Sequence, residues 1–136
     1  MTLAEKVQQR DALRLRLLRE IYEHTQADPI RQIGLKYVDV GMESGEFESA
    51  IGYLDGKGLV EAERLAGLTM LKITSYGIDE IETSIRFPDR ETEYFSPVVI
   101  KIVNNYFENS TVGVLQQDGS GNSAEVEQSV DKTRRA

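Results

Sequence analysis

One stretch of the sequence, residues 44–82, constrains the fold more than any other. Four apolar residues recur at helical spacing in its first part: Phe47, Ala50, Ile51 and Leu54. The Ser44 hydroxyl can accept from the free N–H groups of a first helical turn, so this residue is expected to cap the helix. Gly58 is expected to end it, because glycine adopts the left-handed conformation without steric penalty.

A hairpin and a second helix are predicted next. Leu59–Arg64 and Leu68–Ile73 have strand character, and the loop Leu65–Gly67 between them contains a glycine where a positive φ is expected. Thr74 can cap a following helix. The apolar stripe of that helix consists of Ile78, Ile81 and Ile85. The stretch therefore predicts the order helix, hairpin, helix.

Two more helices are predicted upstream. Residues 3–24 contain no Gly or Pro. The apolar face of this helix consists of Leu13, Leu17, Leu18, Ile21 and Tyr22. Pro29 ends that segment. Ile30–Val40 is the second candidate, although it is rich in β-branched residues and Tyr37–Val40 alternates like a strand. Gly41–Ser44 would be the turn before the next helix. The first helix is expected to share one core with Ile51, Leu54, Leu59, Ile73, Ile78 and Ile81.

This order resembles the winged helix-turn-helix superfamily. The matching residues are Ile51, Leu54, Lys57–Val60, Leu71–Thr74 and Gly77–Glu82. The resemblance implies an α+β fold over residues 1–86, with a three-helix core, a β-hairpin wing and a further helix. It is also the reason for expecting a helix over Ile30–Val40, as the second helix of that core. It also implies DNA binding and transcriptional regulation, with a core helix in the major groove.

Composition excludes several other functions. The 136 residues give room for one domain plus an extension, and the absence of cysteine excludes disulfides and thiolate metal sites. No signal peptide or membrane-spanning stretch is recognised, so a cytoplasmic protein is expected. No catalytic motif, cofactor loop or metal-ligand spacing is present. His24 is the only histidine, and no cysteine or obvious cluster of carboxylates completes a metal site with it. We therefore expect a protein that is not an enzyme and needs no cofactor.

The charges argue against strong DNA binding. The net charge is −7, and residues 44–57 hold three carboxylates against one lysine. The exposed face of that helix is expected to present Glu46, Ser49 and Tyr53, with no Arg, Asn or Gln to read bases. Contacts to a nucleic-acid backbone would come from Arg10, Arg14, Arg16, Arg31, Lys36, Lys57, Arg64 and Lys72. The alternative function is a protein-interaction or scaffold module without DNA binding.

The C-terminal part is predicted to be an extension in β structure. Residues 87–97, which contain Pro88 and Pro97, read as a linker. Residues 98–130 are predicted to form a β-hairpin tail, and residues 131–136 a disordered end. The strand candidates are 98–103, 111–117 and 124–130, and residues 118–122 are turn-forming.

The same region resembles the tails of uncharacterised bacterial winged-helix proteins. The matching residues are Pro88, Glu91–Pro97 and Val114–Gly119. A lone hairpin is marginal in water, so the tail is expected to pair with other copies and make a homo-oligomer, or else to fold back on its own domain. Self-association is assigned to Val98, Ile100, Ile102, Val112, Val114, Gln116, Val126 and Gln128.

Overall fold

The structure, a computed structural model, describes residues 1–116. Its elements are α1 (Leu3–His24), β1 (Ile33–Leu35), the 3-10 helix η1 (Tyr37–Val40), α2 (Ser44–Gly56), β2 (Val60–Leu65), β3 (Leu68–Ile73), α3 (Ser75–Arg86) and α4 (Pro97–Gln116). The fold is α+β, as expected, and the element order is compatible with a winged-helix-like layout. The chain divides into two compact units, Met1–Lys101 and Ile102–Ala136, so the boundary falls within α4.

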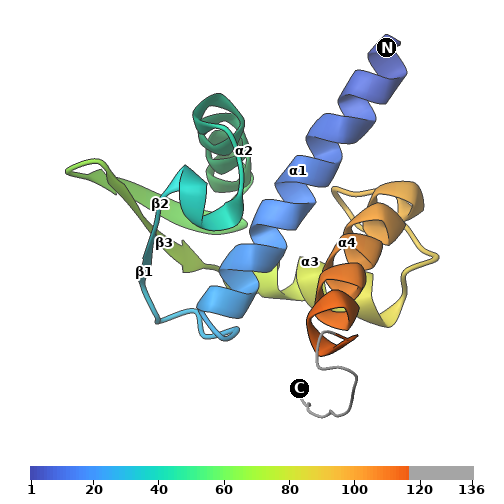
Figure 1. Cartoon of the computed structure of the whole chain (residues 1–136). Coiled ribbons are helices and arrows are strands. Elements are labelled where there is room, and N and C mark those ends of the chain that lie inside the picture. The colour runs from blue at the N-terminus through green and yellow to red at the C-terminus, as the bar shows by residue number, and fades with distance from the viewer. Residues whose placement is uncertain (117–136) are drawn as a thin grey trace. The chain divides into compact units, whose positions relative to one another are not determined.

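The helix predicted over residues 3–24 is confirmed as α1, which packs against both α2 and α3 (Figure 1). A capping box fixes its start: the Thr2 hydroxyl accepts from the Glu5 amide at 3.1 Å, and the Glu5 carboxylate accepts from the Thr2 amide at 2.8 Å. Its buried residues are Leu15, Leu17, Leu18 and Ile21. Leu13 and Tyr22, assigned to the apolar face, are half-buried instead, and Leu15 belongs to the core.

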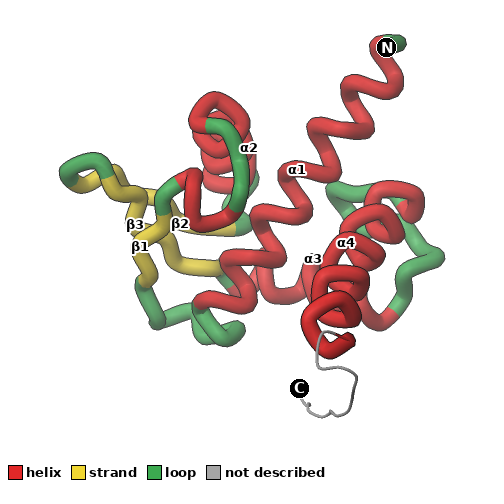
Figure 2. Tube along the Cα trace, in the orientation of Figure 1, coloured by secondary structure: helices red, strands yellow, loops and turns green. Residues whose placement is uncertain are grey.

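The predicted hairpin is also confirmed. β2 and β3 pair antiparallel from Val60 opposite Ile73 to Leu65 opposite Leu68, and β1 adds a third strand on the other edge of β3 (Figure 2). Among the other residues predicted for the core, Ile78 is half-buried. The rest are buried: Ile51, Leu54, Leu59, Ile73 and Ile81. One face of the sheet thus contributes to the core that α1 organises.

The helix expected over Ile30–Val40 is wrong. This segment holds the short strand β1 and the single 3-10 turn η1. Ile33 and Leu35 are strand formers that pair with β3, and a Cβ on Gly34 between them would lie only 2.8 Å from a Leu68 side-chain carbon. Asp39 then accepts from the Lys36 amide at 2.8 Å and starts the 3-10 turn. Pairing with β3 therefore makes Ile33–Leu35 a strand rather than part of a helix.

Thr74 joins the hairpin to α3. As predicted, its hydroxyl accepts from the Gly77 amide, at 3.1 Å, and it also donates to the Gly58 carbonyl at 2.6 Å. Gly58 has a φ of 75°, as expected for the residue that turns the chain out of α2. The cap of α2 is shifted by one residue from the prediction, because Glu43 rather than Ser44 precedes the first turn.

The strands predicted over 98–103 and 111–116 are wrong, because Pro97–Gln116 is the helix α4. Pro97 occupies the first helical position, where its missing N–H costs nothing, and Ser96 Oγ accepts from the Val99 amide at 3.3 Å. Val99, Ile100 and Val103 are all buried, and that spacing suits one side of a helix rather than a strand. The tail prediction for residues 117–136 lies outside the described residues.

The segment after α3, predicted to be a linker, belongs to unit 1 and contains a buried side chain. Phe95 is 3% exposed. The Thr92 amide donates to the Phe95 carbonyl at 2.9 Å, and the Phe95 amide donates to the Thr92 hydroxyl at 3.1 Å. Burial raises the pKa of the Glu80 carboxyl, although the Thr92 hydroxyl and the amides of Glu93 and Tyr94 hydrogen-bond to that carboxyl and partly offset the rise. On the opposite side of α3, Tyr22 donates to Glu82 at 2.9 Å.

Replacing Glu80 by Gln should change how stability depends on pH. The pKa of Glu80 in the folded protein lies above the unfolded value of 4.5. Glu80 therefore stabilises the fold at low pH, and this stabilisation is lost as the pH rises through the folded pKa. The unfolding free energy of Glu80→Gln relative to the wild type should therefore increase from acidic to neutral pH in denaturant titrations. A difference that does not vary with pH would contradict this account of Glu80.

Candidate interaction surface on α2

The outward face of α2 consists of small residues. Phe47, Ala50, Ile51 and Leu54 are buried and define the inner face. On the opposite side, at spacings of four, three and four, lie the exposed residues Gly45, Ser49, Gly52 and Gly56. The spacing of these residues is the sequence signal that could have identified the face in advance.

Nothing in the described part of the chain explains these glycines. A Cβ at Gly45, Gly52 or Gly56 would meet no atom within 4 Å, and none of the three has a positive φ. Gly77 is different, since a Cβ there would lie 2.2 Å from the Leu59 carbonyl oxygen. Glycine inside a helix costs about 1 kcal/mol relative to alanine. At Gly52, which lies inside α2, helix propensity alone would therefore favour alanine.

Carboxylates accompany the small face. α2 carries Glu46, Glu48 and Asp55 and no Lys, Arg, Asn or Gln. The Glu46 carboxylate accepts from the Glu43 amide at 3.2 Å, and Glu48 forms an ion pair with Arg64 of the hairpin. The helix as a whole therefore presents negative charge next to its small residues.

Tyr53 contacts basic side chains rather than pointing freely outward. It is half-buried, and the Arg14 guanidinium lies 3.7 Å from its ring centroid, with the Lys57 ammonium at 5.6 Å. Arg14 also pairs with Asp11 at 3.3 Å. Such cation–π contacts favour a fixed arrangement of α1 against α2. Of the face residues predicted from sequence, Glu46 and Ser49 are exposed, whereas Tyr53 is part of a helix–helix contact.

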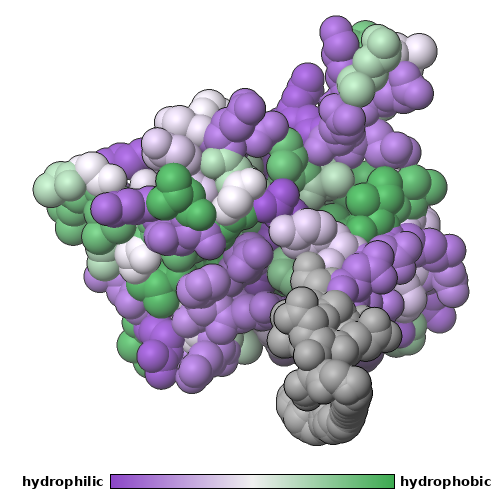
Figure 3. All heavy atoms as spheres, in the orientation of Figure 1, coloured by the Kyte–Doolittle hydropathy of each residue, from purple (hydrophilic) through white to green (hydrophobic). Residues whose placement is uncertain are grey.

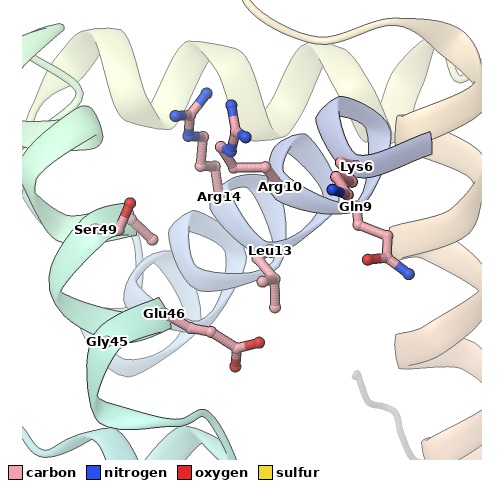
Figure 4. Close-up of a pocket in the computed structure, with 9 residues that line it drawn as sticks. Lys6, Gln9, Arg10, Leu13, Arg14, Gly45, Glu46 and Ser49 are labelled. Carbon is pink, nitrogen blue, oxygen red and sulfur yellow. The ribbon is translucent and has the colours of Figure 1, made fainter. Parts of the chain in front are cut away.

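An open groove of about 350 Å³ lies between α1 and the first turns of α2 (Figure 4). Lys6, Arg10 and Arg14 line it from α1, and Gly45 and Ser49 from α2. In Figure 4 the side chains of Arg10 and Arg14 extend to one side of α1 and that of Leu13 to the other, while Glu46 projects from α2. The groove thus places cations along one edge of the small face.

The remaining predicted backbone contacts do not gather in one place. Arg16 donates to the Val40 carbonyl, which directs its guanidinium to the end of η1. Arg31 and Lys36 are exposed on either side of β1, and Lys72 lies opposite Glu61 in the sheet. Arg64 is the ion-pair partner of Glu48. These positions do not form a continuous basic stripe with Arg10 and Arg14.

Hydrophilic residues predominate on the side of the molecule drawn in Figure 3. Apolar residues form separate areas there. The exposed apolar side chains of the described residues include Leu65, which is 49% exposed at the end of β2. Within residues 1–116, no group of three or more His, Cys, Asp or Glu side chains could hold a metal ion, and no helix is long and apolar enough to cross a membrane.

Two glycine substitutions should have opposite effects on stability. Gly52→Ala should raise the unfolding free energy by up to about 1 kcal/mol, because it improves helix propensity where space is free. Gly77→Ala should lower it by about 1–3 kcal/mol, because its Cβ would clash with the Leu59 carbonyl. Thermal and denaturant unfolding measure both. A Gly52→Ala protein that is destabilised would show that the face has an internal packing role.

Comparisons of this chain with protein-family models, with curated proteins and with solved structures found no match.

Proposed function

We propose that this protein is a winged-helix-like interaction module that packs a helix of a partner protein against the small face of α2. The observation that supports it is the set of Gly45, Ser49, Gly52 and Gly56, which is exposed and has no structural reason within residues 1–116. Small residues on one helix allow the backbone of another to approach closely. Retaining such residues at a cost in helix stability is expected where a partner needs that approach.

DNA reading is supported less well by the same face. Base recognition uses long donor and acceptor side chains such as Arg, Asn and Gln, and α2 has none of them. Its three carboxylates would also lie near phosphates and repel them. A chain with a net charge of −7 gains little from nonspecific electrostatic attraction.

The rival function is DNA binding by a transcriptional regulator. It rests on the winged-helix-like element order and on exposed cations, among them Lys6, Arg10, Arg31 and Lys36. In this case the contacts would be made to phosphates, so binding would tolerate sequence changes and weaken steeply with salt. DNA binding and gene regulation stay predictions of the superfamily resemblance.

A photo-cross-linking amino acid at Ser49, introduced in the cells that make the protein, tests the proposal. We expect a discrete protein adduct that disappears when Gly52→Leu fills the face, because the leucine side chain would prevent close packing. The same cross-linker at Tyr76, which is 70% exposed on α3, serves as the matched control and should not give that adduct.

Fluorescence anisotropy with mixed-sequence duplex DNA at low salt provides the second readout. We expect no salt-dependent binding. Binding that weakens in Arg10→Ala and Lys36→Ala proteins, together with nucleic-acid adducts at Ser49, would overturn the proposal in favour of DNA binding. Adducts that persist unchanged in Gly52→Leu would overturn the role of the small face.

A further inference from the structure

A second candidate surface, separate from the proposed docking face of α2, lies on the exposed side of α4. Val99, Ile100 and Val103 are buried, at 2%, 0% and 2% exposure, and they define one side of the helix. The residues exposed on the other side, up to position 109, include Val98, Ile102, Asn105, Tyr106 and Asn109. Ile100 was predicted to take part in self-association, but it is buried in the single chain. Among the members of that set whose burial the structure describes, Val98 and Ile102 are exposed.

The exposed face of α4 is apolar and poor in charge. Val98, Ile102 and Tyr106, four residues apart, are 53%, 43% and 45% exposed. The whole chain is 29% charged, whereas the 20 residues of α4 include only Lys101 and Glu108 as charged residues. A solvated helix face in such a chain would be expected to carry more charge. This face therefore has the composition of a contact surface.

The spacing on this face is that of a helix-pairing seam. Val98, Ile102, Asn105 and Asn109 follow one another at intervals of four, three and four, which are the a and d positions of heptads. Valine and isoleucine supply apolar contact. Asparagine at such positions stabilises little, so the apolar contact comes from Val98 and Ile102.

We infer that α4 pairs antiparallel with α4 of a second copy of this chain. Lys101 and Glu108 occupy the same flanking heptad position, seven residues apart. An antiparallel pair brings equivalent flanking positions of the two helices together, so Lys101 faces the partner's Glu108 on both sides of the twofold axis. A parallel pair would place Lys101 opposite the partner's Tyr106. The charges therefore favour a second copy in the antiparallel orientation.

The α2 face is unsuitable for the same kind of self-pairing, because its charged residues are all carboxylates and would repel their equivalents. Within the single chain, Lys101 bonds to Asp89 at 2.8 Å, and both side chains are exposed, at 56% and 82%. An exposed ion pair is worth little, so this contact does not prevent Lys101 from turning to a partner.

Sedimentation equilibrium of the full chain tests the inference by charge reversal. Lys101→Glu and Glu108→Lys should each weaken dimerisation on the order of tenfold, because each creates two like-charge contacts in the dimer. The double variant should restore the wild-type dissociation constant, since both contacts become attractive again. Asp89→Asn is the matched control: it removes the intramolecular partner of Lys101 and should leave dimerisation unchanged.

A second pair of variants tests the apolar part of the seam. Ile102→Asp should abolish the dimer, and Tyr106→Ser should weaken it, whereas Tyr76→Ser on α3 should not. Circular dichroism shows whether each variant remains folded. A wild-type chain that stays monomeric at its solubility limit, a double reversal that does not restore pairing, or a dimer indifferent to Ile102→Asp would each overturn the inference.

Discussion

The packing of α1 against both α2 and α3 is the interaction on which unit 1 depends. Leu15, Leu17, Leu18 and Ile21 are each no more than 1% exposed, so α1 is covered on more than one side. Because α1 and β2 both pack against the inner face of α2, the outer face of that helix takes no part in the core. Arg14 strengthens the same contact by lying over the Tyr53 ring. The core thereby fixes which side of α2 is left for a partner.

The parts of the fold that could be predicted from sequence are those in which local signals and burial agree. The run without Gly or Pro in α1, the hairpin loop and Thr74 each had one physical interpretation, and the structure confirms them. Predictions were wrong where β-branched residues occurred in a region of mixed signals. In Ile30–Val40 pairing with β3 makes Ile33–Leu35 a strand, whereas in α4 the buried set Val99, Ile100 and Val103 requires a helix. β propensity favours a strand in both segments, so it agrees with β1, where the helix was expected from the superfamily resemblance, and fails in α4, where tertiary packing decides.

The candidate surface on α2 could also be predicted only in part from the sequence. The acidic character of α2 and its lack of base-reading side chains follow from sequence alone. Sequence cannot show whether a helix glycine is needed inside its own molecule, because the answer depends on atoms that are distant along the chain. Gly77 has the Leu59 carbonyl at 2.2 Å from its absent Cβ, while Gly52 has nothing within 4 Å. The stacking of Arg14 on the Tyr53 ring likewise joins residues that are distant along the chain.

The two proposed surfaces differ in what they can bind, and the difference follows from charge. α2 carries three carboxylates and no cation, so it is suited to a different chain rather than to its own copy. α4 carries one cation and one anion at equivalent heptad positions, so it is complementary to itself when antiparallel. The surfaces share no residue, so pairing through α4 does not use the residues of the α2 face. A dimer would present two such faces, and a partner with two helices could then bind with an avidity above that of either contact alone.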